Sequence, residues 1–402
     1  MKFRYSLILS AALFLLFSCK TVPEKTFSED SAVSVQQEQQ IHSNTIPSAA
    51  LTLLFGGDIM AHVQNFKMND FSVIWKDVAP LIRSADFSFA NIESPVDDDI
   101  PYLSYPVFNM HHEYPEAAIQ AGFNVFSLIN NHSNDQNLAG IMHTLKWAEE
   151  TENRYTDSCR PVYFTGLHNK KNEPVDYITI KKDQWTIIFC AVTEIINKNN
   201  CKEYMNYVPA NEKKRKNFEE HLQKIRRQNQ CDLFILSIHA AVPEYVREIS
   251  ESQRKYYYEL LNSGVDIVWA NHPHVVQERE LIGIHGKEFP TKLIMYANGN
   301  TISGQRREPK LDSPYGLREY TGDGLLYKVT YTKKEDSSPV ILTDTESYYI
   351  TTYINSASQF VIKYLNDDFI DYLKNTGRNN WSSYISERKK IMEKVKEIKT
   401  WL

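Results

Sequence analysis

Residues 51–60, LTLLFGGDIM, run from a short apolar segment into two glycines and an aspartate. An apolar run of this length that ends in glycine is typical of a strand buried on both faces. Functional groups of open α/β sheets gather at the carboxyl ends of such strands. We therefore expect Gly56 and Gly57 to let the backbone turn tightly and present the carboxylate of Asp58.

The same pattern continues along the chain, where short apolar runs alternate with segments of helical spacing. This alternation indicates buried strands joined by crossover helices, an α/β (α+β) fold. The expected strands are 51–56, 87–91, 124–128, 176–180, 186–191, 233–238, 266–270 and 292–297. The expected helices are 73–83, 114–121, 138–150, 213–227 and 251–261. Two hairpin-like strands, 324–331 and 340–343, follow without a helix between them, which predicts a mixed sheet.

Composition narrows the classes of function. The 402 residues are 42% hydrophobic and 24% charged, which is the balance of a globular protein. With 45 basic and 50 acidic side chains the net charge is −5, so the chain has no bias towards polyanions. We therefore exclude nucleic acid as an expected partner.

The N-terminus has the pattern of an exported lipoprotein. Lys2 and Arg4 precede an apolar run that is too short to span a bilayer, and Leu16-Phe17-Ser18-Cys19 resembles a bacterial lipobox. Residues 1–19 are thus predicted to be a lipoprotein signal peptide, with Cys19 carrying the lipid. A plain secretory signal is the alternative. The lipid would hold the protein on a membrane of the cell envelope, facing outside the cytoplasm.

The rest of the chain divides into three predicted segments. Residues 20–49 are polar and predict a flexible tether, and residues 50–354 contain the alternating strands and helices. Residues 355–402 are predicted to be a helical extension, because 356–374 and 381–402 carry apolar residues at helical spacing. That extension either packs on the main domain or binds a partner.

Four cysteines follow the lipobox. Cys190 and Cys231 lie in or beside apolar strand runs and are expected to be buried thiols. Cys159 and Cys201 are the candidate disulfide pair, since an exported protein is exposed to oxidising conditions.

Five of the expected strands end in side chains that are able to bind a metal. These residues are Asp58, Glu93, Asn131, His132, His239, His272 and His274. Carboxylate, amide and imidazole ligands together suit Mn, Zn or Fe, and such a set is costly to bury without a cation. The sequence therefore predicts a site for one or two divalent metal ions. Because Pro273 restricts the residue before it, we expect extended backbone that directs His272 and His274 outward.

At these residues the chain resembles a known family, the CapA (PGA_cap) capsule-synthesis proteins, a branch of the calcineurin-like metallophosphoesterases. The likeness extends over roughly residues 51 to 350. The matching motifs, in order, are Gly57-Asp58-Ile59-Met60, Asn91-Ile92-Glu93, Asn130-Asn131-His132 with Asp135, Asn271-His272-Pro273-His274, and Gly299-Asn300 with Tyr296. The resemblance implies a four-layer α/β/β/α sandwich with the site at the strand ends.

The resemblance also implies a role for each site residue. Asp58 and His274 would bind one metal, and Glu93 stands where the superfamily has a bridging carboxylate. The ligands of the second metal would be Asn131, His239 and His272. In active relatives the histidine at the position of His132 protonates the leaving group, and Asp135 would orient it.

The chain departs from the superfamily pattern at several positions. Met60 stands where many metallophosphoesterases have a histidine ligand, and CapA relatives share this substitution. Ala240-Ala241 follows His239 where the family usually has Trp-Gly, before the pair Glu244-Tyr245. Ala270-Asn271 stands where Gly-His is common. These changes keep the ligands and alter the pocket wall, so substrate choice does not transfer.

Three hypotheses remain open from the sequence. The favoured one is a metal-dependent hydrolase of phosphoester type in the biosynthesis of capsule, poly-γ-glutamate or another surface polymer. The second is a non-catalytic accessory protein that binds an anionic polymer during assembly or export, together with other capsule assembly proteins. In that case Tyr102, Tyr105 and Tyr114 are candidates to line a polymer groove, although packing is the better explanation for each. The third is a structural envelope lipoprotein without a metal.

Overall fold

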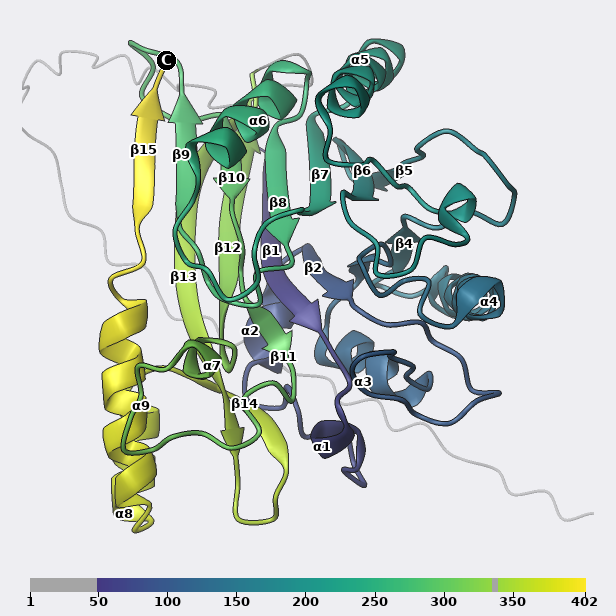
Figure 1. The fold of residues 1–402 in the computed structure, drawn as a ribbon. Helices are drawn as coiled ribbons and strands as arrows, with labels where there is room; N and C mark the ends of the chain where they lie inside the picture. Colours follow the sequence, from purple (N-terminus) through teal and green to yellow (C-terminus); the bar gives the residue numbers. More distant parts are fainter. Residues whose placement is uncertain (1–48, 335–338) are drawn as a thin grey trace, which may run out of the picture. The chain divides into compact units, whose positions relative to one another are not determined.

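Strand β1 (Ala49–Ile59) lies within an eight-stranded mixed sheet (Figure 1). The computed structural model describes residues 49–334 and 339–402. In this first sheet β1 is parallel to its neighbour β2, whereas it pairs antiparallel with β12 on its other side. The order is β14 (Phe360–Tyr364), β13 (Ile341–Ile354), β12 (Asp323–Lys333), β1, β2 (Phe87–Ile92), β3 (Val125–Ser127), β4 (Tyr163–Thr165), with β11 (Asn300–Ile302) pairing with β1.

The second sheet has seven strands and is also mixed. Its order is β15 (Glu397–Trp401), β9 (Arg279–Gly283), β10 (Lys292–Met295), β8 (Ile267–Asn271), β7 (Leu233–His239), β6 (Trp185–Thr193), β5 (Ile178–Lys182). Strands β6, β7 and β8 are parallel, and their register places Thr193, His239 and Asn271 side by side at the carboxyl ends.

The two sheets pack face to face through aromatic side chains. Phe55 and Phe89 of the first sheet contact Trp269 of the second, with ring centroids 5.9 and 6.0 Å apart. Phe189 of β6 meets the ring of Phe89 at 5.4 Å. On β6 the side chains alternate, so that Ile188 belongs to a separate cluster on the outer face of the sheet. This period of two lets one strand serve both the inner and the outer core.

Helices cover the outer faces of both sheets. Helices α5 (Glu212–Gln228) and α6 (Glu251–Asn262) pack on the second sheet through Leu222 and Leu260. On the first sheet, α4 (Asn137–Tyr155) packs through Trp147 against Phe164, 5.1 Å between centroids. The other helices are α1 (Val63–Phe66), α2 (Ala79–Ser84), α3 (Glu113–Ala121), α7 (Leu317–Tyr320), α8 (Asp367–Asn375), α9 (Asn379–Met392) and the 3-10 turn Lys202–Tyr204. The prediction of two central mixed sheets flanked by helices is confirmed.

The paired glycines act differently from the expectation. The strand continues through Gly56 and Gly57 to Ile59 without a tight turn. Glycine is required because the backbone of Gly299 crosses at this point: a Cβ on Gly57 would lie 1.9 Å from the Gly299 carbonyl oxygen. That oxygen accepts a hydrogen bond from the amide of Asp58 at 3.1 Å. The glycine therefore positions Asp58 by close approach of two strands.

Two predicted helical segments are partly wrong. Of 73–83 only the part from Ala79 is helical, because Pro80 fits the first turn of a helix and disrupts its interior. The last fifty residues contain α8 and α9, but Phe360–Tyr364 and Glu397–Trp401 are strands that pair with β13 and β9. Short apolar runs with β-branched residues, such as Val361-Ile362, do not distinguish strand from helix by spacing alone.

The N-terminal predictions fall outside the described residues. These are the signal peptide 1–19 with Cys19, and nearly all of the tether 20–49. Among the described cysteines, Cys159 and Cys201 are both free thiols, so the predicted pair is not bonded. Cys190 is buried, as expected, whereas Cys231 is only partly buried. Within 49–334 and 339–402 no helix has the length and apolarity that crossing a membrane requires.

Candidate metal centre

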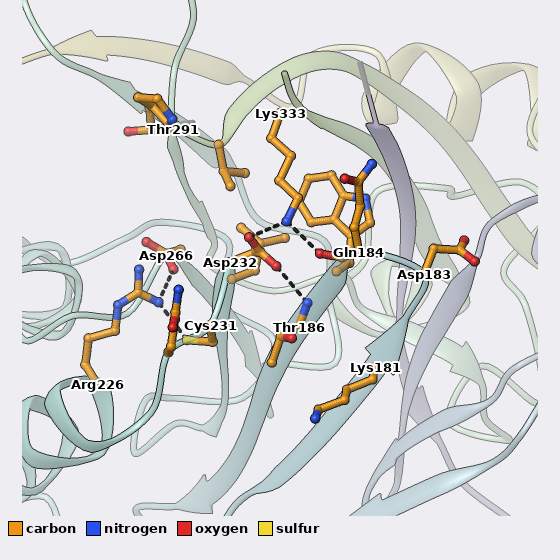
Figure 2. Close-up of a pocket in the computed structure, with 15 residues that line it drawn as sticks. Lys181, Asp183, Gln184, Thr186, Arg226, Cys231, Asp232, Asp266, Thr291 and Lys333 are labelled. Atoms are coloured by element: carbon orange, nitrogen blue, oxygen red, sulfur yellow. Dashed lines mark hydrogen bonds and ion pairs between the residues drawn. The ribbon is translucent and has the colours of Figure 1, made fainter. Parts of the chain in front are cut away.

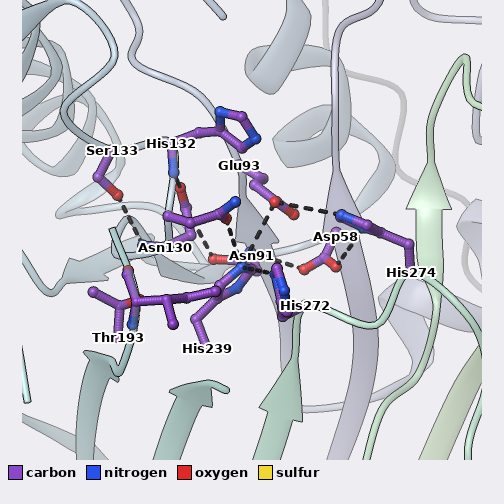
Figure 3. A network of polar contacts seen from close by, with 12 residues as sticks. Asp58, Asn91, Glu93, Asn130, His132, Ser133, Thr193, His239, His272 and His274 are labelled. Atoms are coloured by element: carbon purple, nitrogen blue, oxygen red, sulfur yellow. Dashed lines mark hydrogen bonds and ion pairs between the residues drawn. The ribbon is translucent and has the colours of Figure 1, made fainter. Parts of the chain in front are cut away.

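The polar ends of five strands meet at one place in the structure (Figure 3). Asp58 lies near the end of β1, and Glu93 follows β2 directly. His239 is the last residue of β7, and His272 and His274 come just after β8. Asn131 and His132 lie in the loop between β3 and α4. All of these side chains are buried.

Glu93 is at the centre of the cluster and is fully buried. Its Oε1 lies 3.6 Å from Nε2 of His239 and 3.7 Å from Nε2 of His274. Neither carboxylate oxygen of Glu93 has a hydrogen-bond partner. An unpaired buried carboxylate is costly, and a cation that coordinates both oxygens removes that cost. The residues therefore fit a divalent metal ion.

The remaining ligand candidates are within bonding reach of one another. Oδ2 of Asp58 lies 3.3 Å from Nδ1 of His274. Nε2 of His239 lies 2.8 Å from Oδ1 of Asn131 and 3.2 Å from Nδ1 of His272. The donor atoms form two triads within 4.8 Å, Glu93–His272–His274 and Asp58–Glu93–His239. Glu93 is the residue that the two triads share.

Burial controls the protonation of the cluster. It lowers the pKa of His239 well below its ordinary value and that of His272 to about 4, so both imidazoles are neutral ligands at neutral pH. Burial, with Asp58 and Glu244 adding to it, raises the pKa of Glu93. Burial is the largest single effect on His274 and opposes its charging, but the hydrogen bond and charge of Asp58, the charge of Glu244 and the hydrogen bond with Asn300 together outweigh it, and the pKa of His274 is raised.

The expected backbone around Pro273 is wrong. His272 has φ 104° and His274 has φ 58°, so the segment is bent and not extended. Both imidazoles consequently point inward, towards Glu93 (Figure 3). A non-glycine residue at positive φ costs of order 1–3 kcal/mol and persists only where the surroundings hold it. Here Tyr245, itself at φ 65°, donates its amide to the carbonyl of Pro273 at 2.9 Å.

The predicted proton donor has a firm partner. Nδ1 of His132 donates to Oδ2 of Asp135 at 2.7 Å, and the same oxygen accepts the amide of Phe108. Nδ2 of Asn197 also contacts the ring, 3.1 Å from Nδ1 and 3.3 Å from Nε2. The Asp135 contact fixes the orientation of the ring through Nδ1.

Sequence reasoning did not assign roles to several residues that hold the ligands. Asn91 donates to Oδ1 of Asp58 at 2.8 Å, and Oδ1 of Asn300 lies 3.0 Å from Nδ1 of His274. Both residues lie in motifs that match the family, Asn91-Ile92-Glu93 and Gly299-Asn300, so their position in these motifs could have identified them. Asn197 and His62 stand outside the motifs that were quoted from the sequence, so no motif pointed to them.

Met60 is buried beside this cluster and contributes through its backbone. Its carbonyl oxygen accepts hydrogen bonds from Asn65 at 3.0 Å and Tyr114 at 3.2 Å. Tyr114 is thereby buried in the core and does not line a groove, whereas Tyr105 is 75% exposed. His62 lies near Met60, and its pKa is lowered to about 3 by burial and by His274 and His132.

A large cavity lies at the ends of the strands opposite to the metal cluster (Figure 2). It has a volume of about 740 Å³ and is lined by residues at the starts of β6 and β7, such as Thr186 and Leu233. Four of its charged groups form two ion pairs: Lys333 binds Asp232 at 2.7 Å, and Arg226 binds Asp266 at 3.1 Å. These satisfied pairs have a structural role.

The fold and the cluster define a two-sheet α/β protein with a buried His/Asp/Glu group that is compatible with a divalent metal. The family model of the bacterial capsule synthesis protein PGA_cap matches residues 52–305, more than half of the chain. The protein belongs to this family, and the resemblance found in the sequence is confirmed. The capsule biosynthesis protein CapA of Bacillus anthracis is 25% identical over 300 residues, which are 71% of this chain and 68% of that protein.

Solved structures give more distant likenesses. A novel phosphatase from Mycoplasma pneumoniae aligns over 76% of this chain and 95% of its own, with 14% identity and a TM-score of 0.44. The calcineurin-like phosphoesterase YfkN from Bacillus subtilis aligns over 85% and 100%, with 10% identity and a TM-score of 0.41.

Proposed function

We propose that this protein is a metal-dependent hydrolase of phosphoester type that acts in the biosynthesis of a capsule or another surface polymer. The observation that carries the proposal is the Glu93 carboxylate, buried without a hydrogen-bond partner among Asp58 and three imidazoles. Burying an unpaired carboxylate in a protein core is costly, and a bound cation offsets that cost. Membership of the capsule synthesis family supports the biological setting.

The donor set indicates which residues would hold the metal. Glu93 would contribute to both positions, with Asp58 and the imidazoles completing them, and the mixture of oxygen and nitrogen ligands suits Mn, Zn or Fe. When bound, the cation supplies Lewis acidity that polarises a phosphoryl oxygen. Asn91 and Asn300 keep Asp58 and His274 oriented by hydrogen bonds.

Proton transfer is the part that the chain itself would perform. His132 is hydrogen-bonded through Nδ1 to Asp135, so Nε2 is available to donate a proton to the departing oxygen. Asp135 holds the ring in place through Nδ1. Asn197, whose Nδ2 lies 3.1 Å from Nδ1 and 3.3 Å from Nε2, limits the rotation of the ring further.

We further propose that lipid on Cys19 anchors the protein in the cell envelope, outside the cytoplasm. The apolar run and the lipobox-like residues at the N-terminus support this location. A Cys19→Ser variant is then expected in the soluble fraction after cell lysis, whereas the unaltered protein is expected in the membrane fraction. An unaltered protein that is already soluble contradicts the anchor.

The hydrolase proposal is tested on protein purified without chelator. We expect metal analysis to find bound Mn, Zn or Fe, and we expect hydrolysis of bis-p-nitrophenyl phosphate that rises when Mn²⁺ is added. A preparation that binds no metal under any loading condition contradicts the proposal.

The accessory hypothesis is the second candidate, and Met60 is the observation that favours it. A thioether binds hard or borderline cations poorly, and Met60 stands two residues after Asp58 where many metallophosphoesterases have a ligand. In that case the centre binds an anionic polymer without cleaving it. Bound metal with no turnover, together with a normal capsule in a His132→Ala strain, would decide for this candidate.

A further inference from the structure

A cavity of about 790 Å³ adjoins the candidate metal centre. His62 and Tyr245 line it, and both also contact the site region: the ring of Tyr245 lies 6.3 Å from that of His274. Gln305 lines the cavity as well and accepts a hydrogen bond from Asn300, the partner of His274, at 2.8 Å. The cavity therefore lies next to residues that contact the candidate ligand His274.

Three exposed cationic side chains line the cavity: Arg307, Lys310 and Arg318. Arg318 contacts the hydroxyl of Tyr245 at 3.3 Å and stacks on its ring. Arg307 is paired only weakly, with the exposed Glu308 at 3.8 Å. Lys310 is held through its backbone amide, which donates to Glu319 at 3.2 Å, and the residue is exposed.

The carboxylates at the cavity are largely engaged elsewhere. Glu319 accepts hydrogen bonds from Tyr384 at 2.5 Å and from the amide of Lys310. Glu244 is hydrogen-bonded by Tyr245 and faces the imidazoles of the centre, which together lower its pKa against the opposing effect of burial. The cavity wall thus presents cations that are available to an anion.

The wall that carries these cations is rigidly supported. Buried Arg306 binds Asp323 at 2.9 Å, and Arg388 of helix α9 binds the same carboxylate at 2.7 Å. Arg388 also donates to the carbonyl of Pro314 at 2.6 Å. The segment between Gly304 and Glu319 is therefore held from behind by the C-terminal helix, and its charged tips are pre-organised.

The mouth of the cavity is apolar. Tyr105 and Leu317 line it and are 75% and 68% exposed. Large exposed apolar side chains around a concave site are typical of a surface that binds a ligand. Tyr105 and Leu317 would pack against the uncharged backbone of a bound chain, while the anionic groups of that chain reach the cations of the cavity wall.

We propose that this cavity binds an anionic group of the substrate that lies beside the reacting group, with Lys310 and Arg318 determining specificity. The substrate then carries at least one further anionic group, a carboxylate or a phosphate, beside the reacting group, and is not a small monoester. The inference rests on the proposed function for the identity of the reacting group, but binding in the cavity does not require a metal.

Binding is tested by calorimetry on the full chain, stripped of metal and then dialysed free of chelator. The ligands are blocked tetra-aspartate, blocked tetra-asparagine and tripolyphosphate. The variant is Lys310→Gln/Arg318→Gln, and the matched control is Lys146→Gln/Lys255→Gln, two exposed lysines on α4 and α6. We expect the first variant to bind the preferred anion at least tenfold more weakly and the control to be unchanged.

The outcomes separate the sources of the anion. Tighter binding of tetra-aspartate identifies a carboxylate, and tighter binding of tripolyphosphate identifies a phosphate. Equal affinity of the variant and the unaltered protein, or equal binding of tetra-asparagine, overturns the proposal. Hydrolysis of bis-p-nitrophenyl phosphate by the Lys146→Gln/Lys255→Gln control is expected to be unchanged. If neither the unaltered protein nor the variants hydrolyse bis-p-nitrophenyl phosphate while anion binding remains selective, the hydrolase proposal fails and the cavity proposal stands.

Discussion

Oε1 of Glu93 lies 3.6 Å from Nε2 of His239, and this carboxylate has no hydrogen-bond donor on either oxygen. Burial lowers the pKa of His239 and raises the pKa of Glu93, so neither group provides the charge that the other needs. The pair is therefore arranged for a third species between them, and a divalent cation has the required charge.

Glu93→Gln is expected to abolish binding of Mn²⁺ or Zn²⁺. In the unaltered protein, metal at a hundred times its Kd should stabilise the fold by about 2.7 kcal/mol, and the variant should lose this gain. Equilibrium dialysis with metal analysis and thermal unfolding measure the two effects. Glu219→Gln is the control, because Glu219 is buried but pairs with Lys216 at 3.0 Å. Metal binding that survives Glu93→Gln contradicts the central role of this carboxylate.

In metal-free protein we expect Glu93→Gln also to change how the stability of the fold depends on pH. The pKa of Glu93 is raised in the folded state above the unfolded value of 4.5. The protonated side chain therefore makes its full contribution to stability below pH 4.5, and this contribution is lost as the pH rises through the folded pKa. At pH 7 the metal-free Gln variant should therefore be more stable than the unaltered protein by about 1–3 kcal/mol. The difference should vanish near pH 4.5. Chemical denaturation at a series of pH values measures it, and a variant that is less stable at pH 7 is the contrary result.

His132→Ala is expected to lower kcat by about 10²–10⁴ without changing the metal content. The reason is that His132 is placed to donate a proton, while the adjacent ligand Asn131 keeps its own side chain. The loss should be larger for a phenyl phosphodiester than for the p-nitrophenyl ester, whose leaving group needs no proton. His143→Ala, a partly exposed histidine of α4 that pairs with Asp97 and is not among the candidate ligands, is the control. Equal losses for both esters would assign His132 a structural role.

His62 gives a pH prediction outside the ligand set. Its pKa is lowered to about 3 in the folded protein from an unfolded value of 6.5, with burial the largest cause. The unfolded chain therefore binds the proton first, and stability falls as pH drops from 6.5 towards 3, by about 1.4 kcal/mol per pH unit. In metal-free protein, His62→Gln should reduce the slope of the unfolding free energy against pH, between pH 6 and 5, by the amount that one bound proton contributes. Replacing the exposed His285 should leave the slope unchanged.

The strand ends could be predicted because buried parallel strands have a strong local signature. Each apolar run pointed to one polar residue, and parallel pairing brings such ends together. This is how Asp58, Glu93 and His239 were identified from segments far apart in the sequence. The signal is local in each strand, and the sheet supplies the long-range contact.

Other features depended on contacts that no local pattern records. The need for glycine at position 57 comes from the backbone of Gly299, more than two hundred residues away. The inward orientation of His272 requires a positive φ that Pro273 alone would not predict. Strand β15 forms because the edge of β9 is available, and an edge strand is a property of the assembled sheet.

Arg388→Met is expected to show that helix α9 is part of the substrate cavity wall. The substitution leaves buried Asp323 with one arginine and removes the hydrogen bond to Pro314, so the fold should lose about 3–5 kcal/mol, measured by denaturation. Lys390→Met, on the exposed face of the same helix, should change stability by less than about 0.5 kcal/mol. Under conditions where both variants are folded, only Arg388→Met should weaken the binding of polyanions, because Lys310 and Arg318 lose their support. Unchanged binding in a destabilised Arg388→Met protein would show that α9 stabilises the fold without shaping the cavity.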